Sequence, residues 1–208
     1  MQTRLYLTHE DHGRELSWDD FRSSDAELGY RYELIEGKVY VTPFPSLSHS
    51  SYCDWLDDIL DDYEDERPDI IARVISRPGV FVPNPNVHTC IRPDIACYKT
   101  FAARFDPSAD YRDYSPILVV EVISADSAGK DLVRNRRLYL QVPSIREYWI
   151  LDPREGVEGL TMLVYRRRGR RWAACLTIGP GATYTTPVLP GFSLVVDPWA
   201  APRQGADA

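Results

Sequence analysis

Two acidic residues, each set inside a strand-like apolar run, constrain this 208-residue chain most strongly. Asp94 lies within the run Ile91–Cys97, and Glu121 lies within the run Ile117–Ile123. Burying a carboxylate is costly unless it is paired with a cation or binds one. The two runs are separated by a connection of hairpin or loop length, so we expect the carboxylates to meet across neighbouring strands. There they would hold one divalent metal ion.

The length and composition indicate one domain. We expect it to span 1–208, with a core at about 30–197, a polar N-terminal segment at 1–29 and a frayed tail at 200–208. The hydrophobic fraction of 44% argues against disorder. No apolar stretch approaches the roughly 20 residues that cross a bilayer. The first ten residues contain one Arg and no apolar core of a signal peptide, so we expect no membrane association and a cytoplasmic location.

The cysteines do not indicate a metal site. They show no C-x-x-C spacing and no nearby histidine pair, so we interpret them as reduced, mostly buried small apolar residues. The four are Cys53, Cys90, Cys97 and Cys175.

The net charge of −7 is unusual for a nucleic-acid-binding protein, because phosphate binding depends on Lys and Arg. The charges are segregated, however. An acidic run occupies 54–66, whereas basic residues gather at 130–137 and 166–171. Either basic segment is suited to follow a phosphate backbone. For the second segment the alternative is an exposed hairpin turn that arginines keep soluble.

Hydrophobic periodicity predicts three helices and a series of strands. The helices are expected at 17–21, 48–63 and 130–141, the first capped by Ser17 and the second with an acidic outer face. The inner face of the third is assigned to Leu132, Val133, Leu138 and Tyr139. The strands are expected at 32–41 (two strands around a Glu-Gly turn), 70–82 (interrupted at Pro78-Gly79), 92–98, 116–123, 146–152, 161–167, 172–178 and 182–186. This order predicts an α/β (α+β) fold: a mixed central sheet flanked by helices, with additional antiparallel strands in the N- and C-terminal parts.

Several local strings together resemble one family. They are Tyr32–Gly37, Pro43-x-Pro45-Ser46-x-x-His49, Pro93-Asp94, Glu121–Ser124, Asp131 with Tyr139, and Glu147–Pro153. From about Tyr32 to Phe192 the chain resembles the Uma-type family of restriction endonucleases, a branch of the PD-(D/E)XK nuclease-like fold. The resemblance implies a restriction-endonuclease-like core, Mg²⁺ or Mn²⁺, and a DNA phosphodiester substrate. It also implies a homodimer, because cutting both strands takes two sites.

Metal-dependent phosphodiester hydrolysis needs carboxylates that hold a hard cation. We assign this role to Asp94 and Glu121, and the resembling fold adds a main-chain carbonyl, of Val122 or Ile123. The alternative for Asp94 is a turn or capping aspartate after a proline. The resemblance makes Glu33 a third acidic residue of the site. Its alternative is a surface position on an alternating strand.

The catalytic lysine of the resembling fold is missing. Its common position, two residues after the glutamate, is Ile123 here. The Uma-type alternative places it on the following helix, four residues after an aspartate and four before a tyrosine. In this chain that frame reads Asp131, Asn135, Tyr139, so asparagine replaces lysine. Residues four apart share a helix face, so we expect these three side chains to lie together.

Other residues can supply the missing positive charge or bind the substrate. Lys130 is the nearest replacement ammonium, and Arg134 has a long enough side chain to reach back. His49 is expected to line the site or bind a substrate phosphate, with helix capping as its alternative. With Arg134 and Tyr139 it completes the substrate-binding set. A serine nucleophile at Ser124 or Ser127 is disfavoured, because the chain has no G-x-S-x-G motif.

Three functions compete at this point. The first is a Mg²⁺-dependent DNA endonuclease, impaired by the replacement of lysine with Asn135. The second is a catalytically inactive protein of the same fold that binds DNA or a partner. The third is a scaffold whose acidic helix face meets a basic partner. That face would comprise Asp57, Asp58, Asp61, Asp62 and Asp65.

Overall fold

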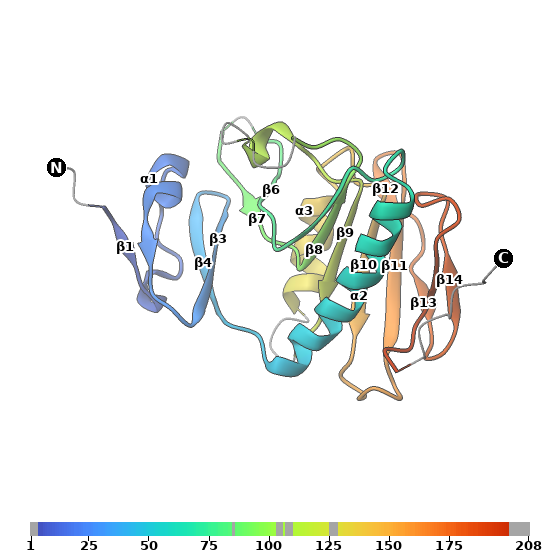
Figure 1. The fold of residues 1–208 in the computed structure, drawn as a ribbon. Helices are drawn as coiled ribbons and strands as arrows, with labels where there is room; N and C mark the ends of the chain where they lie inside the picture. Colours follow the sequence, from blue (N-terminus) through green and yellow to red (C-terminus); the bar gives the residue numbers. More distant parts are fainter. Residues whose placement is uncertain (1–3, 85, 103–105, 107–109, 125–128, 200–208) are drawn as a thin grey trace.

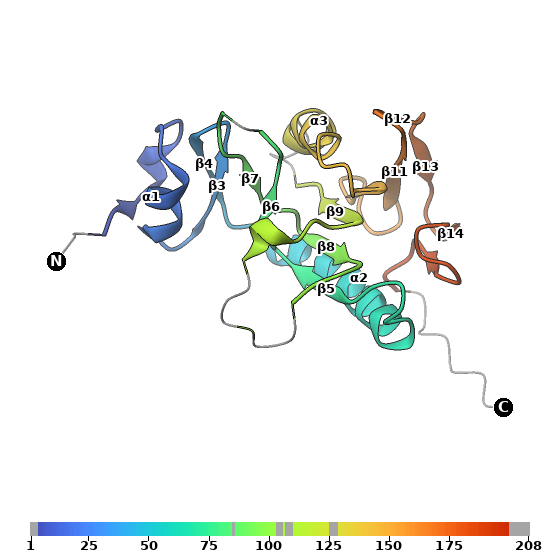
Figure 2. The same ribbon diagram turned by 90° about the horizontal axis from the view of Figure 1, so that it is seen from above.

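The fold is built on a mixed seven-stranded sheet with helices on both faces (Figures 1 and 2). It was analysed in a computed structural model that describes residues 4–84, 86–102, 106, 110–124 and 129–199. The predicted frayed tail and Ser127 lie outside these residues. The strand order is β12-β11-β10-β9-β8-β5, with β13 also pairing with β11. Only β9 and β10 run parallel, and every other pair in this sheet is antiparallel. The predicted mixed sheet is confirmed.

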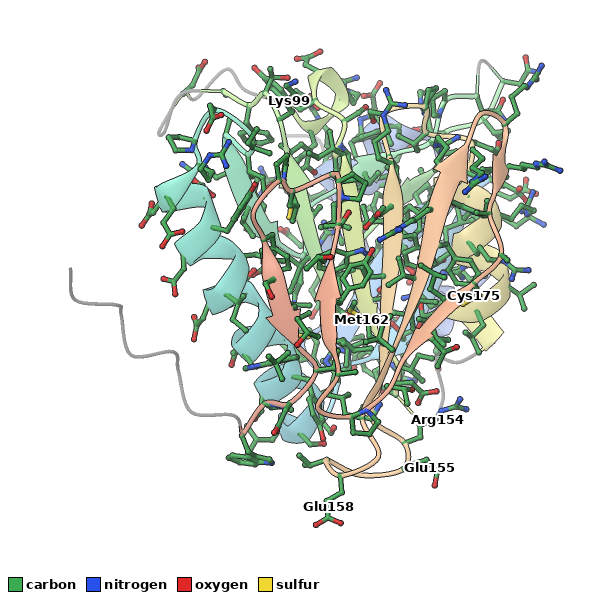
Figure 3. The ribbon with its side chains drawn as sticks, turned by 90° about the vertical axis from the view of Figure 1, so that its right-hand side faces the viewer. Lys99, Arg154, Glu155, Glu158, Met162 and Cys175 are labelled. Carbon is green, nitrogen blue, oxygen red and sulfur yellow. The ribbon has the colours of Figure 1, made fainter. Side chains whose placement is uncertain are left out.

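The strands of this sheet follow the predicted apolar runs. Their bounds are β5 Arg73–Ser76, β8 Ile95–Tyr98, β9 Leu118–Val122, β10 Glu147–Asp152, β11 Thr161–Arg168, β12 Arg171–Trp172 and β13 Leu176–Ile178. All residues of β8 and β9 are buried, because helices cover the central strands on both sides. The loop between β10 and β11, by contrast, carries Arg154, Glu155 and Glu158 out into solvent (Figure 3).

The two faces of the sheet pack against different helical segments. Leu118, Val120 and Val122 of β9 pack with α2 (Leu47–Glu66) through Leu56 and Leu60. The opposite face packs against the helical segment formed by η3 (Lys130–Asn135), a π-helical turn, and α3 (Arg136–Tyr139). Figure 2 shows α2 and α3 on opposite sides of the sheet. Glu121 alternates with Val120 and Val122, so it faces the η3/α3 side.

A second, four-stranded sheet lies beside the first. Its order is β4-β3-β7-β6, with bounds β3 Tyr30–Ile35, β4 Lys38–Pro43, β6 Val80–Phe81 and β7 Cys90–Ile91. The predicted hairpin turn is present. Glu36 (φ 52°) and Gly37 (φ 76°) both have positive φ, as the tight turns that match strand twist require.

Short elements extend both ends of the chain. At the N-terminal end they are β1 Tyr6–Leu7, η1 His9–Asp11, α1 Trp18–Ser23 and β2 Asp25–Ala26. Helix α1 is capped as predicted, because the Ser17 side chain accepts the N–H of Asp20 at 3.1 Å. The N-terminal segment was expected to be polar, but it contributes to the core: Leu7 is fully buried against Leu34 and Val39. At the C-terminal end β14 (Thr183–Thr185) pairs with β15 (Ser193–Val195).

Several predicted elements need correction. The strand expected at 92–98 begins only at Ile95, because Pro93 has no N–H to donate and interrupts the sheet. Asp94 therefore lies at the junction between the two sheets rather than inside a strand. The strand expected at 70–82 is divided between the two sheets as β5 and β6, and that expected at 172–178 is divided into β12 and β13.

The predicted inner face of the third helix is wrong at Val133, whose exposure is 64%. Asp131 and Asn135 of this turn are buried instead, as their four-residue spacing to Tyr139 indicates. In α2 the acidic face is mostly exposed, but Glu64 is buried and pairs with Arg73 at 3.1 Å. No helix of the described residues is both long and apolar enough to cross a bilayer.

The arginines of the basic segment 166–171 fall into two groups, one that makes contacts within the fold and one that is exposed. Arg166 pairs with the buried carboxylate of Glu147 at 3.0 Å. The Arg167 guanidinium donates to the carbonyls of Tyr139, Leu140 and Val142. Arg168, Arg170 and Arg171 are exposed around the turn at Gly169. The exposed-turn interpretation therefore holds only for the last three.

We predict that Arg166→Ala lowers the free energy of unfolding by about 2 kcal/mol, because it leaves the buried Glu147 carboxylate without its cation. Arg168→Ala is the matched control and should change it by no more than about 0.5 kcal/mol. Urea denaturation followed by circular dichroism measures both. Equal losses for the two variants would contradict a structural role specific to Arg166.

Candidate active site

The predicted residues on η3 and α3 converge on Glu121. The amide Nδ2 of Asn135 donates to Glu121 Oε1 at 2.8 Å, and the Tyr139 hydroxyl donates to the same oxygen at 2.7 Å. Asn135 Nδ2 also donates to Asp131 Oδ1 at 3.2 Å. The side chains of Asp131, Asn135 and Tyr139 are all buried. The three thus share one inward face, and the asparagine lies between two carboxylates.

Asp94 is held from three directions at the junction of the sheets. Its Oδ1 accepts a hydrogen bond from Arg31 Nη1 at 3.0 Å. Its Oδ2 accepts the backbone N–H of Val122 at 2.9 Å and lies 3.2 Å from His49 Nε2. Burial alone would raise the pKa of Asp94, but His49 and then Arg31 hold it down at about 2. Asp94 is therefore ionised at neutral pH and joins distant elements, unlike a local turn aspartate.

Glu33 is buried, so its surface interpretation is wrong. Both faces of β3 are covered: Tyr32 and Leu34 pack against the N-terminal segment, whereas Ile35 packs into the main core. Glu33 Oε1 accepts the N–H of Arg92 at 2.9 Å.

The two cationic residues predicted to replace the lysine both reach Glu33. Its Oε2 lies 3.2 Å from Arg134 Nη2 and 3.4 Å from Lys130 Nζ. Burial opposes the charge on Lys130, but Glu33 and Glu121 raise its pKa above the usual value. Lys130 is therefore protonated at neutral pH, so it can stabilise negative charge but cannot act as a general base.

Glu121 is the electrostatic exception in the site. Burial raises its pKa well above the usual value, and the charges of Asp131 and Asp94 raise it further. Lys130 opposes this rise. Among the described residues, Glu121 has no ion-pair partner within 4.0 Å. The site therefore holds a buried carboxyl group whose ionisation is opposed by burial and by neighbouring acidic groups.

His49 and Cys53 form a hydrogen-bonded chain behind Asp94. His49 Nε2 faces Asp94, while His49 Nδ1 lies 3.5 Å from Cys53 Sγ. These three side chains are the one cluster of possible ligands in the described part of the chain whose atoms all lie within 4.8 Å. One ion cannot use both histidine nitrogens, however, and burial raises the pKa of the Cys53 thiol, so it stays protonated. We interpret the cluster as a support that orients Asp94.

The remaining predicted residues are placed as follows. His49 does not cap α2, because the Ser46 side chain accepts the His49 N–H at 3.3 Å and is the cap. Ile123 is buried one residue after β9 and donates its N–H to the Leu151 carbonyl at 2.8 Å. Ser124 is half-buried. Arg134 bends back to the site as predicted, whereas Arg137 pairs with Glu36.

Two residues of the site were missed from the sequence. Arg31 contacts Asp94 directly, and its position two residues before Glu33 on the same strand face was the available signal. Cys53 follows His49 by four residues, the spacing that places two side chains on one helix face.

The sequence profile of the Uma2 family, described as "Putative restriction endonuclease", matches residues 18–197, and the chain belongs to that family. No curated protein matches the chain. A solved structure from Anabaena variabilis, described as a "putative nuclease belonging to DUF820", matches with a TM-score of 0.66 and 18% identity. The match covers 87% of this chain and 95% of that one, which confirms the nuclease-like fold.

We predict that Glu121→Gln stabilises the protein in EDTA at neutral pH. Glutamine keeps an oxygen that accepts from Asn135 and Tyr139 but removes the carboxyl group whose ionisation burial opposes. A carboxyl group whose pKa is higher in the folded state costs stability as the pH rises above its unfolded value. The advantage should be absent below pH 4.5, the usual pKa of Glu, and should grow above it. At pH 7 we expect at least about 1 kcal/mol, or about 2–4 °C in Tm.

Glu33→Gln is the control for this experiment. It removes the carboxylate that pairs with Lys130 and Arg134, so it should lower the Tm at neutral pH. Thermal denaturation of both variants between pH 4 and 8 tests the account. A Glu121→Gln protein less stable than the wild type at pH 7 would show that the charge is compensated.

Proposed function

We propose that the protein is a Mg²⁺- or Mn²⁺-dependent endodeoxyribonuclease that hydrolyses phosphodiester bonds of DNA in the cytoplasm. Asp94 and Glu121 are its metal ligands, with the main-chain carbonyl of Val122 or Ile123 as a further ligand. The single observation that carries this proposal is the buried, uncompensated carboxylate of Glu121 next to Asp94 and Asp131. A bound cation would supply a positive charge beside Glu121.

The chemistry of these side chains fits a hard divalent cation. The candidate ligands are carboxylate and carbonyl oxygens, which Mg²⁺ and Mn²⁺ prefer. When bound, such a cation lowers the pKa of a coordinated water and neutralises charge on the phosphate. Arg31 Nη1 already occupies Asp94 Oδ1, so cation binding at that oxygen must compete with Arg31.

The cationic side chains around Glu33 would act on the phosphate. Lys130 and Arg134 both lie at Glu33 Oε2, and an arginine stays protonated at any physiological pH. Their role in the proposal is to stabilise negative charge that develops on the phosphodiester. Tyr139 holds Glu121 through its hydroxyl, while His49 holds Asp94. In this account both are positioning residues.

The second candidate function is DNA or partner binding without cleavage. Asn135 favours it. This residue lies midway between Asp131 and Tyr139 in the sequence, where the Uma-type pattern has a lysine, and its side chain is a neutral amide. Loss of a preorganised cation or base typically costs about 10²- to 10⁴-fold in rate. We therefore expect slow cleavage by the natural protein. Cutting both strands would need two copies, so we also propose a homodimer.

We predict that Asn135→Lys raises the rate of supercoiled-plasmid nicking in Mn²⁺ by about 10²-fold or more. The Asn135 amide donates to both Glu121 and Asp131, so an ammonium here would also lower the pKa of Glu121. Asp94→Asn in either background should abolish nicking.

The wild type distinguishes the two candidate functions. Slow nicking that Asp94→Asn abolishes supports the nuclease. Cleavage only after Asn135→Lys identifies a disarmed nuclease, for which binding is the function. Cleavage that survives Asp94→Asn would contradict the site assignment, and no cleavage by any variant would contradict the nuclease proposal.

We predict that Mn²⁺ stabilises the wild type by about 2.7 kcal/mol at 100 times its Kd. Glu121→Gln and Asp94→Asn should abolish this gain, because each removes a proposed ligand. Cys53→Ser should keep it, because the thiol belongs to the support behind Asp94. Thermal denaturation at increasing Mn²⁺ measures all four proteins. Loss of the gain in Cys53→Ser and Asp94→Asn, but not in Glu121→Gln, would place the ion in the cluster of His49, Cys53 and Asp94.

A further inference from the structure

A second feature adjoins the carboxylates: a pocket of about 770 Å³ at the N-terminal end of the molecule. It lies where α1, β3, β6, β7 and the short helix η2 (Tyr111–Asp113) come together (Figure 2). Its volume is in the range of small-ligand sites. None of the functions derived so far uses it.

The pocket is rich in arginine although the chain as a whole is acidic. Arg22, Arg31, Arg77 and Arg92 line it. Arg22 Nη1 lies 3.5 Å from Asp110 Oδ2 and is thus paired. The side chains of Arg77 and Arg92 are exposed and have no hydrogen-bond or ion-pair partner among the residues described. Two guanidinium groups are therefore available to an anion.

The two carboxylates in the pocket wall are already satisfied. Glu27 accepts from the ring and the backbone of His9, at 2.9 and 3.0 Å. Asp110 accepts from the guanidinium of Arg112 at 2.8 Å. Neither leaves the pocket with a strong unpaired negative charge, so the free arginines dominate its electrostatics.

Donors without a partner lie just beneath the same wall. Arg31 uses Nη1 for Asp94, but its Nε and Nη2 are buried without a hydrogen-bond partner in the described part of the chain. The same holds for Nε1 of Trp18. Unsatisfied buried donors are rare and costly, about 1–3 kcal/mol each, and they add positive charge beneath the pocket at Arg31.

The backbone conformation of Arg77 is a further sign of a functional site. Arg77 has φ +54°, a left-handed conformation that costs a non-glycine residue about 1 kcal/mol or more. Its N–H donates to the carbonyl of Asp94 at 2.9 Å, and the N–H of Arg92 donates to Glu33. The backbones of the two free arginines are thereby held beside Asp94 and Glu33.

Aromatic side chains form the rest of the pocket. Trp18 and Phe81 pack edge to face, with ring centroids 4.6 Å apart. Tyr111 also lines the pocket, with 40% of its surface exposed. Aromatic rings beside a positively charged groove are the usual platform on which nucleic-acid bases stack.

We propose that this pocket holds one unstacked nucleotide of the DNA strand, with its phosphate on Arg77 and Arg92 and its base against the aromatic wall. The identity of the ligand rests on the proposed nuclease function. The position beside Asp94 and Glu33 makes this nucleotide a neighbour of the bond to be cut.

The test is binding of a fluorescent single-stranded oligothymidylate of about ten nucleotides, measured by anisotropy in EDTA. Arg77→Gly and Arg92→Gln should each weaken binding about 10-fold or more, and each should reduce the slope of log K against log salt by about 0.7. Arg77→Gly should not lower the Tm, because glycine adopts the left-handed conformation without strain. Arg170→Gln, at the exposed turn at the far end of the main sheet, is the charge-matched control and should bind like the wild type (Figure 1).

A second measurement tests the base. Tyr111→Ala should weaken binding of the oligothymidylate about 5-fold or more, through the loss of stacking. It should leave the affinity for an abasic deoxyribose-phosphate chain of the same length unchanged. Equal weakening of both chains would overturn the assignment of a nucleotide.

The remaining outcomes are decisive as well. Wild-type affinity in Arg77→Gly and Arg92→Gln, an equal loss in Arg170→Gln, or no binding by the wild type would overturn the pocket proposal. Plasmid nicking by the wild type together with unaffected pocket variants would show that this inference alone fails. Binding lost in the pocket variants without any nicking, even by Asn135→Lys, would show that the nuclease proposal alone fails.

Discussion

Buried charge at the junction of the two sheets is the constraint on which the site depends. Asp94 and Glu33 have partners built in beside them there: His49 and Arg31 for the first, and Lys130 with Arg134 for the second. Glu121 accepts hydrogen bonds from the neutral donors Asn135 and Tyr139, and burial together with the nearby charge of Asp131 raises its pKa. Burying such a group lowers the stability of the cation-free protein. A bound cation would offset this cost, so the arrangement favours a cation-binding role.

The fold creates this imbalance through three local features. Alternation along β9 turns Glu121 toward the η3/α3 side, while its neighbours Val120 and Val122 pack against α2. Pro93 interrupts the strand pairing between β7 and β8, and Asp94 therefore lies where the two sheets meet. The π-helical turn η3 widens the helix at Asp131 and Asn135, and π-helical turns are frequent at functional sites.

The sequence allowed the strands and the main residues of the candidate site to be predicted, because both follow from local patterns. Apolar runs around Asp94 and Glu121 indicated buried carboxylates, and four-residue spacing indicated that Asp131, Asn135 and Tyr139 share a face. The family assignment made from the short strings was confirmed. The roles given to these residues in catalysis and metal binding stay predictions.

What the sequence did not reveal depends on pairing between distant segments. Arg31 reaches Asp94 across 63 positions, which no local pattern records. Val133 was assigned to the inner face with Leu138 and Tyr139, although at about 100° per residue it lies nearly opposite them on an α-helix, and it is exposed. The arginine pocket is assembled from α1, β3 and the ends of β5 and β7, so its charges are scattered through an acidic sequence.

The most direct test is the anomalous diffraction of crystals soaked in Mn²⁺. The account predicts one strong anomalous peak beside the carboxylates of Asp94 and Glu121, the residues that would hold the ion. A peak between His49 and Cys53, or no peak in crystals that diffract well, would contradict it.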